Sequence, residues 1–452
     1  MPEPPARSRW PQSHDEPAEA PNQAMIPRRA VGTALLAAGL CLAMPVPAEA
    51  PATKEKKVTT SPLYAARFAG PRRDSAIVGE TRAEGVVEWS RDIGLPAGSA
   101  PRDVLSWQGG IAVVGGGRVV QYSTNGERLW DRPASQGAPV VAANGLLYLV
   151  SRNTELEAVD ATNIARLKEA PIPGQASRKF QLELLWPRQD DFVTTSYMAD
   201  PTYDSEDLSR PQPKPLTVGR RTVYGEAIGA WGVSHDGHQR LPPLLLPGPG
   251  LWVIALDQVV VVNLSTEEER PHFKLSLSEL TEWSADSSGT LYVTGYAGGN
   301  KALLAVTTAG REMWRWIDKD EPDRWAASQP PMLGLQGRAF LLTEGRVLAI
   351  DAGKLTWSYD ARSESLRHGA LAAEGSFEVK DGRLLSTAKL RYGTSLSDGS
   401  ILVVGSKTLR RIDASGRKVF ALTLATDIVT PPVVDADGNV YVATASQLIK
   451  IR

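Results

Sequence analysis

Two short segments of the sequence contain residue types that hold metal ions. His235 and His238 stand on either side of Asp236 and Gly237, and two imidazoles with a carboxylate between them could begin a transition-metal site. The same four residues have the form of a glycine turn, and the other histidines beyond residue 50, His272 and His368, are distant in sequence. We therefore expect a structural or exposed role here and no metal site, with His235, Asp236 and His238 as the candidates if one exists.

The segment Asp435–Asn439 resembles the start of a calcium-binding loop. An EF-hand loop places glycine sixth and glutamate twelfth, whereas here Gly438 is fourth and the twelfth residue is Ser446. An aspartate shortly before a glycine recurs elsewhere, as at Asp286 and Gly289, and this is typical of a hairpin turn. The sequence contains no nucleophile-elbow, P-loop, dinucleotide or HExxH motif, so we predict no catalytic residue and no cofactor.

These turns belong to a pattern that recurs along the chain. Seven segments begin with glycine and continue with β-branched, aliphatic or aromatic residues, as a buried strand should. They start at Gly110, Gly145, Gly250, Gly289, Gly337, Gly399 and Gly438. Apart from the interval between 145 and 250, the spacings run from 35 to 62 residues, which fits a propeller repeat of four short strands.

Four of these repeats end on a further element, G-x-x-x-aromatic, which we expect to form the outermost strand of the blade, and a fifth copy stands near residue 85. Its copies are Gly85 to Trp89, Gly126 to Trp130, Gly310 to Trp314, Gly353 to Trp357 and Gly416 to Phe420. The first copy stands before any complete repeat, and the last repeat stops at Arg452 without one. We therefore predict that the strand around Trp89 completes the last blade and closes the ring without an open edge.

The fold class is accordingly all-β, as a single β-propeller over residues 85–452. The interval of 105 residues from Gly145 to Gly250 is too long for one blade and contains β-rich stretches around a polar segment, 199–219. We interpret it as one diverged blade with an insertion, which gives eight four-stranded blades; seven and nine remain the alternatives. A second irregular stretch, 362–390, contains a possible extra hairpin at Lys380–Arg383.

The glycine turn, the L-x-A-[LIV]-D strand and the G-x-x-x-W strand together resemble the PQQ-like repeat of the quinoprotein dehydrogenase-like superfamily. Ala349-Ile-Asp-Ala-Gly353 followed by Trp357 shows the pattern most clearly. In that superfamily the tryptophan docks each outer strand against the next blade. The resemblance therefore implies docking roles for Trp89, Trp130, Trp314, Trp357 and Phe420.

The superfamily contains both enzymes and non-catalytic members, such as the propeller subunit of the outer-membrane β-barrel assembly machinery. The dehydrogenases carry adjacent cysteines over the quinone and an acidic calcium site. This chain has one cysteine, Cys41, and no acidic cluster that maps onto the calcium site. The resemblance therefore supports the fold and argues against quinone chemistry.

The first fifty residues have the features of export. Residues 25–50 combine a basic start, an apolar stretch and the small-x-small site Ala48-Glu49-Ala50, as in a cleaved signal peptide. We interpret 1–24 as a mis-annotated extension and 51–84 as a leader. Leu40 before Cys41 argues against a lipoprotein, so we expect a periplasmic or secreted protein with no membrane-spanning segment after cleavage.

Charge and motif content narrow the function. The formal net charge is −1, which offers no basic excess for nucleic acid. We expect a non-catalytic, monomeric ring that binds another envelope or surface protein, with 199–219 as either a surface loop or a docking arm. The alternative is a protein that binds a quinone, sugar or metal, or an enzyme, at the central channel.

Overall fold

In the computed structural model almost all assigned secondary structure is β-strand. The structure describes residues 64–65, 76–77, 81–107, 110–134, 140–143, 146–150, 155–160, 166–171, 180–187, 191–198, 216–222, 227–233, 241–246, 250–255, 257–266, 268–319, 325, 329–334, 337–361, 377–380, 383–386 and 389–452. The extension 1–24, the signal peptide 25–50 and its Ala48–Ala50 site, predicted above, lie outside these residues. So does 199–215, which is most of the predicted insertion.

The described strands form eight sheets of four or five strands and one two-stranded hairpin. The first half of the chain contributes β1 (Tyr64–Ala65), β2 (Ala76–Ile77), β3 (Val87–Asp92), β4 (Pro101–Trp107), β5 (Gly110–Gly115), β6 (Arg118–Tyr122), β7 (Arg128–Pro133), β8 (Val141–Ala143), β9 (Leu146–Val150), β10 (Glu155–Asp160), β11 (Arg166–Pro171), β12 (Phe180–Pro187), β13 (Asp191–Met198), β14 (Leu216–Thr222), β15 (Ala227–Val233), β16 (Leu244–Leu245), β17 (Gly250–Ala255), β18 (Gln258–Asn263) and β19 (Glu269–Lys274). The second half contributes β20 (Ser278–Ala285), β21 (Leu291–Ala297), β22 (Asn300–Val306), β23 (Glu312–Ile317), β24 (Met332–Leu333), β25 (Ala339–Leu342), β26 (Arg346–Asp351), β27 (Lys354–Asp360), β28 (Phe377–Lys380), β29 (Arg383–Ser386), β30 (Tyr392–Leu396), β31 (Ile401–Val404), β32 (Thr408–Ile412), β33 (Lys418–Thr423), β34 (Val433–Val434), β35 (Val440–Ala443) and β36 (Gln447–Ile451).

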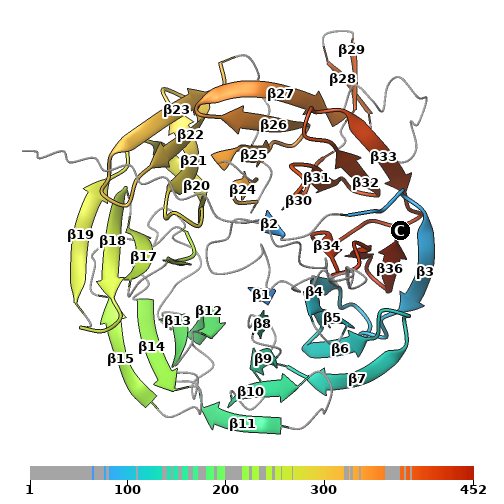
Figure 1. Cartoon of the computed structure of the whole chain (residues 1–452), viewed down its shortest axis with the longest axis horizontal. Helices are drawn as coiled ribbons and strands as arrows, with labels where there is room; N and C mark the ends of the chain where they lie inside the picture. The colour runs from blue at the N-terminus through green and yellow to red at the C-terminus, as the bar shows by residue number, and fades with distance from the viewer. Residues whose placement is uncertain are drawn as a thin grey trace, which may run out of the picture. The chain divides into compact units, whose positions relative to one another are not determined.

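The larger sheets follow one another around a central axis, as Figure 1 shows, and each contains four antiparallel strands that run in order from the axis to the perimeter. The chain is thus an all-β propeller, as predicted. Between β11 and β16 the structure has one four-stranded sheet, β12–β15. The number of blades in the whole ring stays a prediction.

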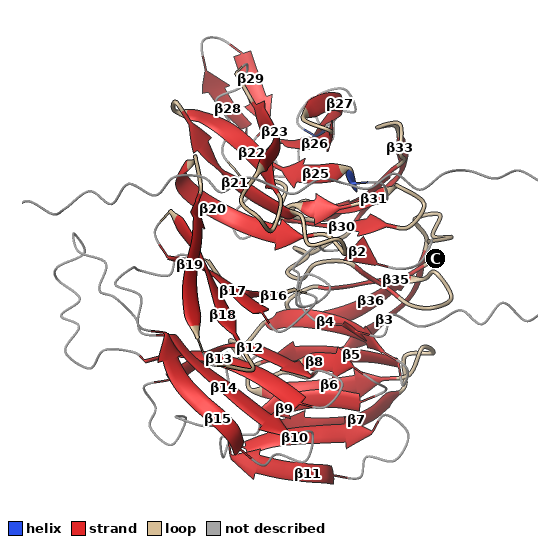
Figure 2. Ribbon diagram, turned by 60° about the vertical axis from the view of Figure 1, so that its left-hand side comes forward, coloured by secondary structure: helices blue, strands red, loops and turns tan. Residues whose placement is uncertain are grey.

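The predicted extra hairpin is present as β28 and β29, with Lys380 opposite Arg383. It forms a sheet of its own and lies outside the ring of larger sheets in both Figure 1 and Figure 2. Its position follows from its sequence, because the hairpin falls between β27 and β30, where the chain passes from one blade to the next.

The ring is closed by two strands, one near the start and one at the end of the range 58–452. Strand β3 pairs antiparallel with β36, so that Ser90 lies opposite Ile449. The amides of Val86 and Arg452 each donate to the other residue's carbonyl, at 3.0 and 2.9 Å, and the Ile93 amide donates to Ser446 at 2.8 Å. The prediction that the strand around Trp89 completes the last sheet is confirmed.

The core consists of apolar layers between successive sheets. One buried cluster joins Tyr292 of β21 to Leu348 of β26, and another joins Ile111 of β5 to Tyr441 of β35. A blade buries both of its faces in this arrangement, because each face packs on a neighbour. In the described residues, no helix is long and apolar enough to cross a lipid bilayer.

Candidate functional site: the contacts between outer strands

The aromatic residue of each G-x-x-x-aromatic element lies at the junction of two sheets. Trp89 of β3 is 9% exposed, and its indole Nε1 donates to the Thr124 carbonyl in the β6–β7 turn at 3.3 Å. The glycine of that turn, Gly126, has a φ of +83°, and a Cβ built on it would lie 3.1 Å from Trp89 Cδ2. The absence of a side chain therefore lets the turn rest on the face of the indole ring.

Two cations strengthen the same junction. Lys450 of β36 is 7% exposed, and its Nζ donates to the Thr124 carbonyl at 3.3 Å and to Glu88 at 3.2 Å. The Arg91 Nε donates to the Gly126 carbonyl at 3.1 Å. Strand β3 is therefore tied to the β6–β7 turn through an aromatic face, an indole N–H and a guanidinium.

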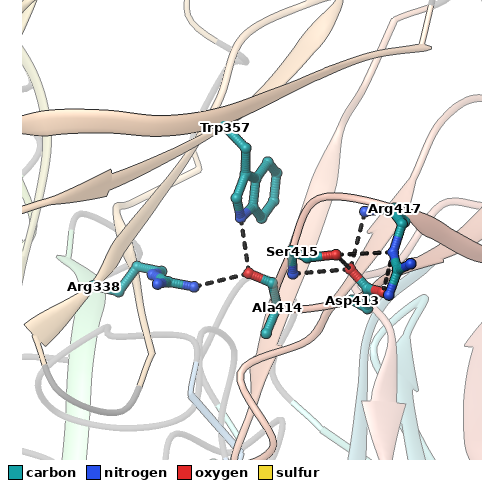
Figure 3. Close-up of polar contacts among 6 residues, drawn as sticks. All are labelled: Arg338, Trp357, Asp413, Ala414, Ser415 and Arg417. Carbon is teal, nitrogen blue, oxygen red and sulfur yellow. Dashed lines mark hydrogen bonds and ion pairs between the residues drawn. The ribbon is translucent and has the colours of Figure 1, made fainter.

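A second junction has the same design, and Figure 3 shows it. The Trp357 indole of β27 donates to the Ala414 carbonyl at 3.0 Å, and Arg338 Nη1 donates to the same oxygen at 2.9 Å. A Cβ on Gly416, which has a φ of +86°, would lie 2.8 Å from Trp357 Cγ. The first glycine of one outer-strand element is thus the seat for the aromatic ring of the preceding sheet.

The same relation links Trp314 to Gly353 and Phe420 to Gly85, where an added Cβ would lie 3.1 Å from Trp314 Cβ and 2.9 Å from Phe420 Cδ2. The last of these contacts reaches the N-terminal strand. Gly85 receives Phe420 from β33 while Trp89, four residues on, reaches the β6–β7 turn. Strand β3 therefore contacts both neighbours as any other outer strand would.

Phe273 is an aromatic residue of this set that the sequence pattern did not find. It lies in β19, and a Cβ on Gly310 would come within 2.7 Å of its ring. Glu269 stands where the pattern requires glycine, so a search for G-x-x-x-aromatic passes it over. The signal that the sequence did offer was an aromatic residue four positions after the first residue of an outer strand.

Trp130 of β7 is 8% exposed and packs in a cluster with Leu147 of β9. Its indole nitrogen has no hydrogen-bond partner among the described residues. The residues that would correspond in sequence to Thr124 or Ala414 fall in 161–165, outside the described residues. We propose that these rings, Trp89, Trp130, Phe273, Trp314, Trp357 and Phe420, hold successive sheets together.

A pair of glycine substitutions tests this proposal. Gly416 and Gly98 have similar φ values of +86° and +78°, but a Cβ on Gly98 would meet nothing within 4 Å. Alanine at either site carries the same backbone strain. We expect Gly416→Ala to lower the free energy of unfolding by about 1–3 kcal/mol more than Gly98→Ala, because Trp357 must also shift. Urea unfolding of both variants measures the difference. Equal losses of unfolding free energy would contradict the role of Gly416 as the position on which the Trp357 ring rests.

The aspartates before the glycines are structural. Asp435 accepts the Asp437 and Asn439 amides at 2.9 Å each and the Tyr441 hydroxyl at 2.8 Å. Burial, and then the Asp435 carboxylate, raise the pKa of Tyr441 above its usual range. The segment that resembled a calcium loop is a hairpin turn whose carboxylate is already satisfied by protein donors.

The turn beside Trp357 is built in the same way. Hydrogen bonds, first from the Ser415 hydroxyl, lower the pKa of Asp413 to about 2. Its Oδ1 accepts the amides of Ser415 and Arg417 at 2.9 and 3.0 Å (Figure 3). The carboxylate therefore fixes the turn that presents the Ala414 carbonyl to Trp357 and Arg338.

One buried charge cluster joins two neighbouring sheets. Asp318 follows β23, and its Oδ2 lies 2.7 Å from Arg346 Nη2 of β26 and 3.3 Å from Lys301 Nζ of β22. All three side chains are less than a tenth exposed. Opposite charges this deeply buried stabilise each other only as a set, so the cluster fixes the relative position of the two sheets.

Among the described residues, no group of three or more His, Cys, Asp or Glu could hold a metal ion. His235, Asp236 and His238 lie outside these residues. His272 of β19 lies against Trp252, with ring centroids 5.5 Å apart, and contacts the Thr308 carbonyl.

The outer strands also display apolar side chains to solvent. Met313 of β23, Leu355 of β27 and Val419 of β33 are 52%, 46% and 52% exposed. Val86, Val87 and Leu129 complete the set. We call these six residues the outer band; they belong to β23, β27, β33, β7 and the β3 region, which follow one another along one part of the ring (Figure 1).

No protein-family model matches the chain, and no curated protein matches it. Solved structures, in contrast, do match the chain. The quinohemoprotein alcohol dehydrogenase ADHIIG from Pseudomonas putida HK5 is 10% identical, with a TM-score of 0.52 over 87% of this chain and 80% of that one. BamB from Moraxella catarrhalis is 12% identical, with a TM-score of 0.46 over 81% and 99%. Hsv2 from Kluyveromyces lactis is 9% identical, with a TM-score of 0.44 over 73% and 99%. The first of these likenesses shows the fold, a β-propeller.

Proposed function

We propose that this PQQ-like β-propeller is an exported, non-catalytic scaffold of the bacterial envelope that binds another protein. The observation that carries the proposal is the outer band. Large apolar side chains that stand half exposed at neighbouring places on a rigid surface favour contact with a protein partner. The predicted signal peptide supports the envelope location.

The outer band fits a partner that spans several blades. Met313 and Val419 stand directly before the docking aromatic of their strands, and Leu355 stands two residues before Trp357. Met313 and Val419 are 52% exposed, whereas Trp314 is partly buried and Phe420 is 8% exposed, so the two apolar side chains point away from the junctions that the aromatic rings fill. Each of the sheets that end on β23, β27 and β33 therefore offers one apolar contact at its outer strand.

A triple variant tests the proposal. We expect Met313→Ser, Leu355→Ser and Val419→Ser together to weaken binding of the captured envelope partner at least about tenfold, because central apolar contacts dominate interface energetics. The wild-type protein first captures partners from envelope extract, and the dissociation constant of the purified partner is then measured for both proteins.

The matched control carries Glu312→Ser, Lys354→Ser and Lys418→Ser in the same strands. These exposed polar residues should leave the dissociation constant and the melting temperature unchanged. Equal affinity for the apolar triple variant and the wild type would refute the role of the outer band. Capture of nothing beyond a blank column by the wild type would refute the scaffold itself.

The alternative, a small ligand or an enzymatic reaction at the central channel, has the shared fold of the Pseudomonas dehydrogenase in its favour. Fold alone does not carry chemistry. Addition of PQQ with calcium distinguishes the two functions, since a ligand of the folded state raises its melting temperature. The scaffold proposal expects no shift and no dye-linked oxidation of alcohols or sugars.

A further inference from the structure

Two of the sheets have a fifth strand at the axis of the ring. Strand β1 pairs with β8, and strand β2 pairs with β30, in both cases beyond the first strand of the meander. In the other larger sheets the innermost described strand is β4, β12, β16, β20, β24 or β34. Both extra strands come from the segment that the sequence indicated as a leader.

The pairings place β1 and β2 on the inner side of the ring, each against a different sheet. Tyr64 lies opposite Ala143 and Ala65 opposite Ala142, in antiparallel register, while Ala76 lies opposite Ser395 in parallel register. Figure 1 shows β1 and β2 near the centre, inside β8 and β30. Ten residues lie between Ala65 and Ala76, and the eleven Cα-to-Cα steps that join them can span about 36 Å when extended.

The residues on both sides of the pairings are mostly small. Alanine stands at positions 65 and 76 of the segment and at 142 and 143 of β8, and β30 offers Ser395. Ser395 is 1% exposed and Leu396 is 2% exposed. Small side chains let a backbone approach closely where sheets converge, so recognition here rests on main-chain hydrogen bonds.

The pairings are also short. Each extra strand has two residues, and two-residue ladders contribute few hydrogen bonds. Elements held by few contacts open at a small fraction of the global free energy of unfolding. Opening would leave the inner edges of β8 and β30 with unpaired backbone groups, which are templates for another extended chain.

We propose that the inner edges of β8 and β30 form an acceptor for an extended peptide at the axis of the ring, and that β1 and β2 of this chain are its resident and exchangeable occupants. The ligand class is an unbranched backbone in β conformation. Another extended chain that pairs with the inner edge of β8 or β30 must first displace β1 or β2. The proposal does not depend on the outer band or on an envelope partner.

Hydrogen exchange measured by mass spectrometry tests the proposal. Deletion of residues 62–79 keeps β3 and the closure of the ring. We expect amide exchange in 141–143 and 393–396 to become at least about tenfold faster, because those amides lose their partners or their cover. Exchange in β21, β22 and β36 should not change.

A synthetic peptide of residues 62–79, added to the deletion variant, should restore slow exchange in both segments, while a scrambled peptide should not. Ala65→Pro with Ile77→Pro provides a second variant that keeps the chain length and removes two backbone donors. Unchanged exchange at 141–143 and 393–396 in both variants would overturn the proposal. If exchange becomes faster in the deletion variant and the peptide does not slow it again, the occupant is not exchangeable and that part of the proposal is wrong.

Discussion

A chain that lacks residues 1–93 is expected to lose cooperative unfolding and to aggregate. The deletion removes β3 and leaves β36 as an unpaired edge whose backbone then invites pairing with other molecules. It also removes the buried side chains of Ala83, Trp89 and Ile93, and two large apolar side chains alone contribute about 3–6 kcal/mol. That loss is comparable with the whole stability of a typical domain. Size-exclusion chromatography and thermal unfolding measure the outcome.

The matched control is a chain that lacks only residues 1–79. It keeps Thr81, whose hydroxyl donates to the Gly438 carbonyl at 2.7 Å, and all of β3. This control should stay soluble and unfold cooperatively. A chain without residues 1–93 that behaves like the control would show that β3 is not needed to close the ring.

The second large effect is expected for Trp89→Ala, which should lower the free energy of unfolding by about 3–5 kcal/mol. The substitution removes the ring on which Gly126 rests, the N–H that reaches the Thr124 carbonyl and the contact with Tyr441, whose ring centroid lies 5.9 Å away. It also leaves Lys450 beside a cavity at the junction. Urea unfolding measures the loss.

Two controls separate the junction from a general effect on β3. Val87→Ala changes a 41% exposed residue of the same strand and should alter the free energy of unfolding by less than about 0.5 kcal/mol. Trp89→Phe keeps an aromatic face, as Phe420 does at Gly85, and should cost about 1 kcal/mol for the lost hydrogen bond. If Trp89→Ala costs no more than Val87→Ala, the docking role fails.

The outer strands and their turns could be predicted because they depend on local rules. Gly126 and Gly416 need a positive φ, and the aromatic residue four positions later repeats at a fixed spacing. Both signals are visible in one sequence. The closure by the Trp89 strand followed from counting the same element at both ends, and β3 pairs with β36 as expected.

What the sequence did not reveal depends on contacts between distant segments or on elements too short to have a period. Strands β16, β24 and β34 have two residues each, and no alternation can be recognised over that length. Strands β1 and β2 are equally short and pair only through tertiary contacts. Phe273 escaped because Glu269 replaces the glycine, although the Phe273 ring still lies against Gly310.

The register of β3 against β36 is the most direct test of the account. In a chain whose single native cysteine is replaced by Cys41→Ser, Ser90→Cys and Ile449→Cys stand opposite each other, within the range that a disulfide spans. Ser90→Cys with Gln447→Cys is shifted by two residues, beyond easy bridging. We predict that mild oxidation links the first pair nearly completely and the second pair poorly, as measured by mass spectrometry of the peptides. Equal linkage of both pairs, or none of the first, would contradict the closure of this propeller by its N-terminal strand.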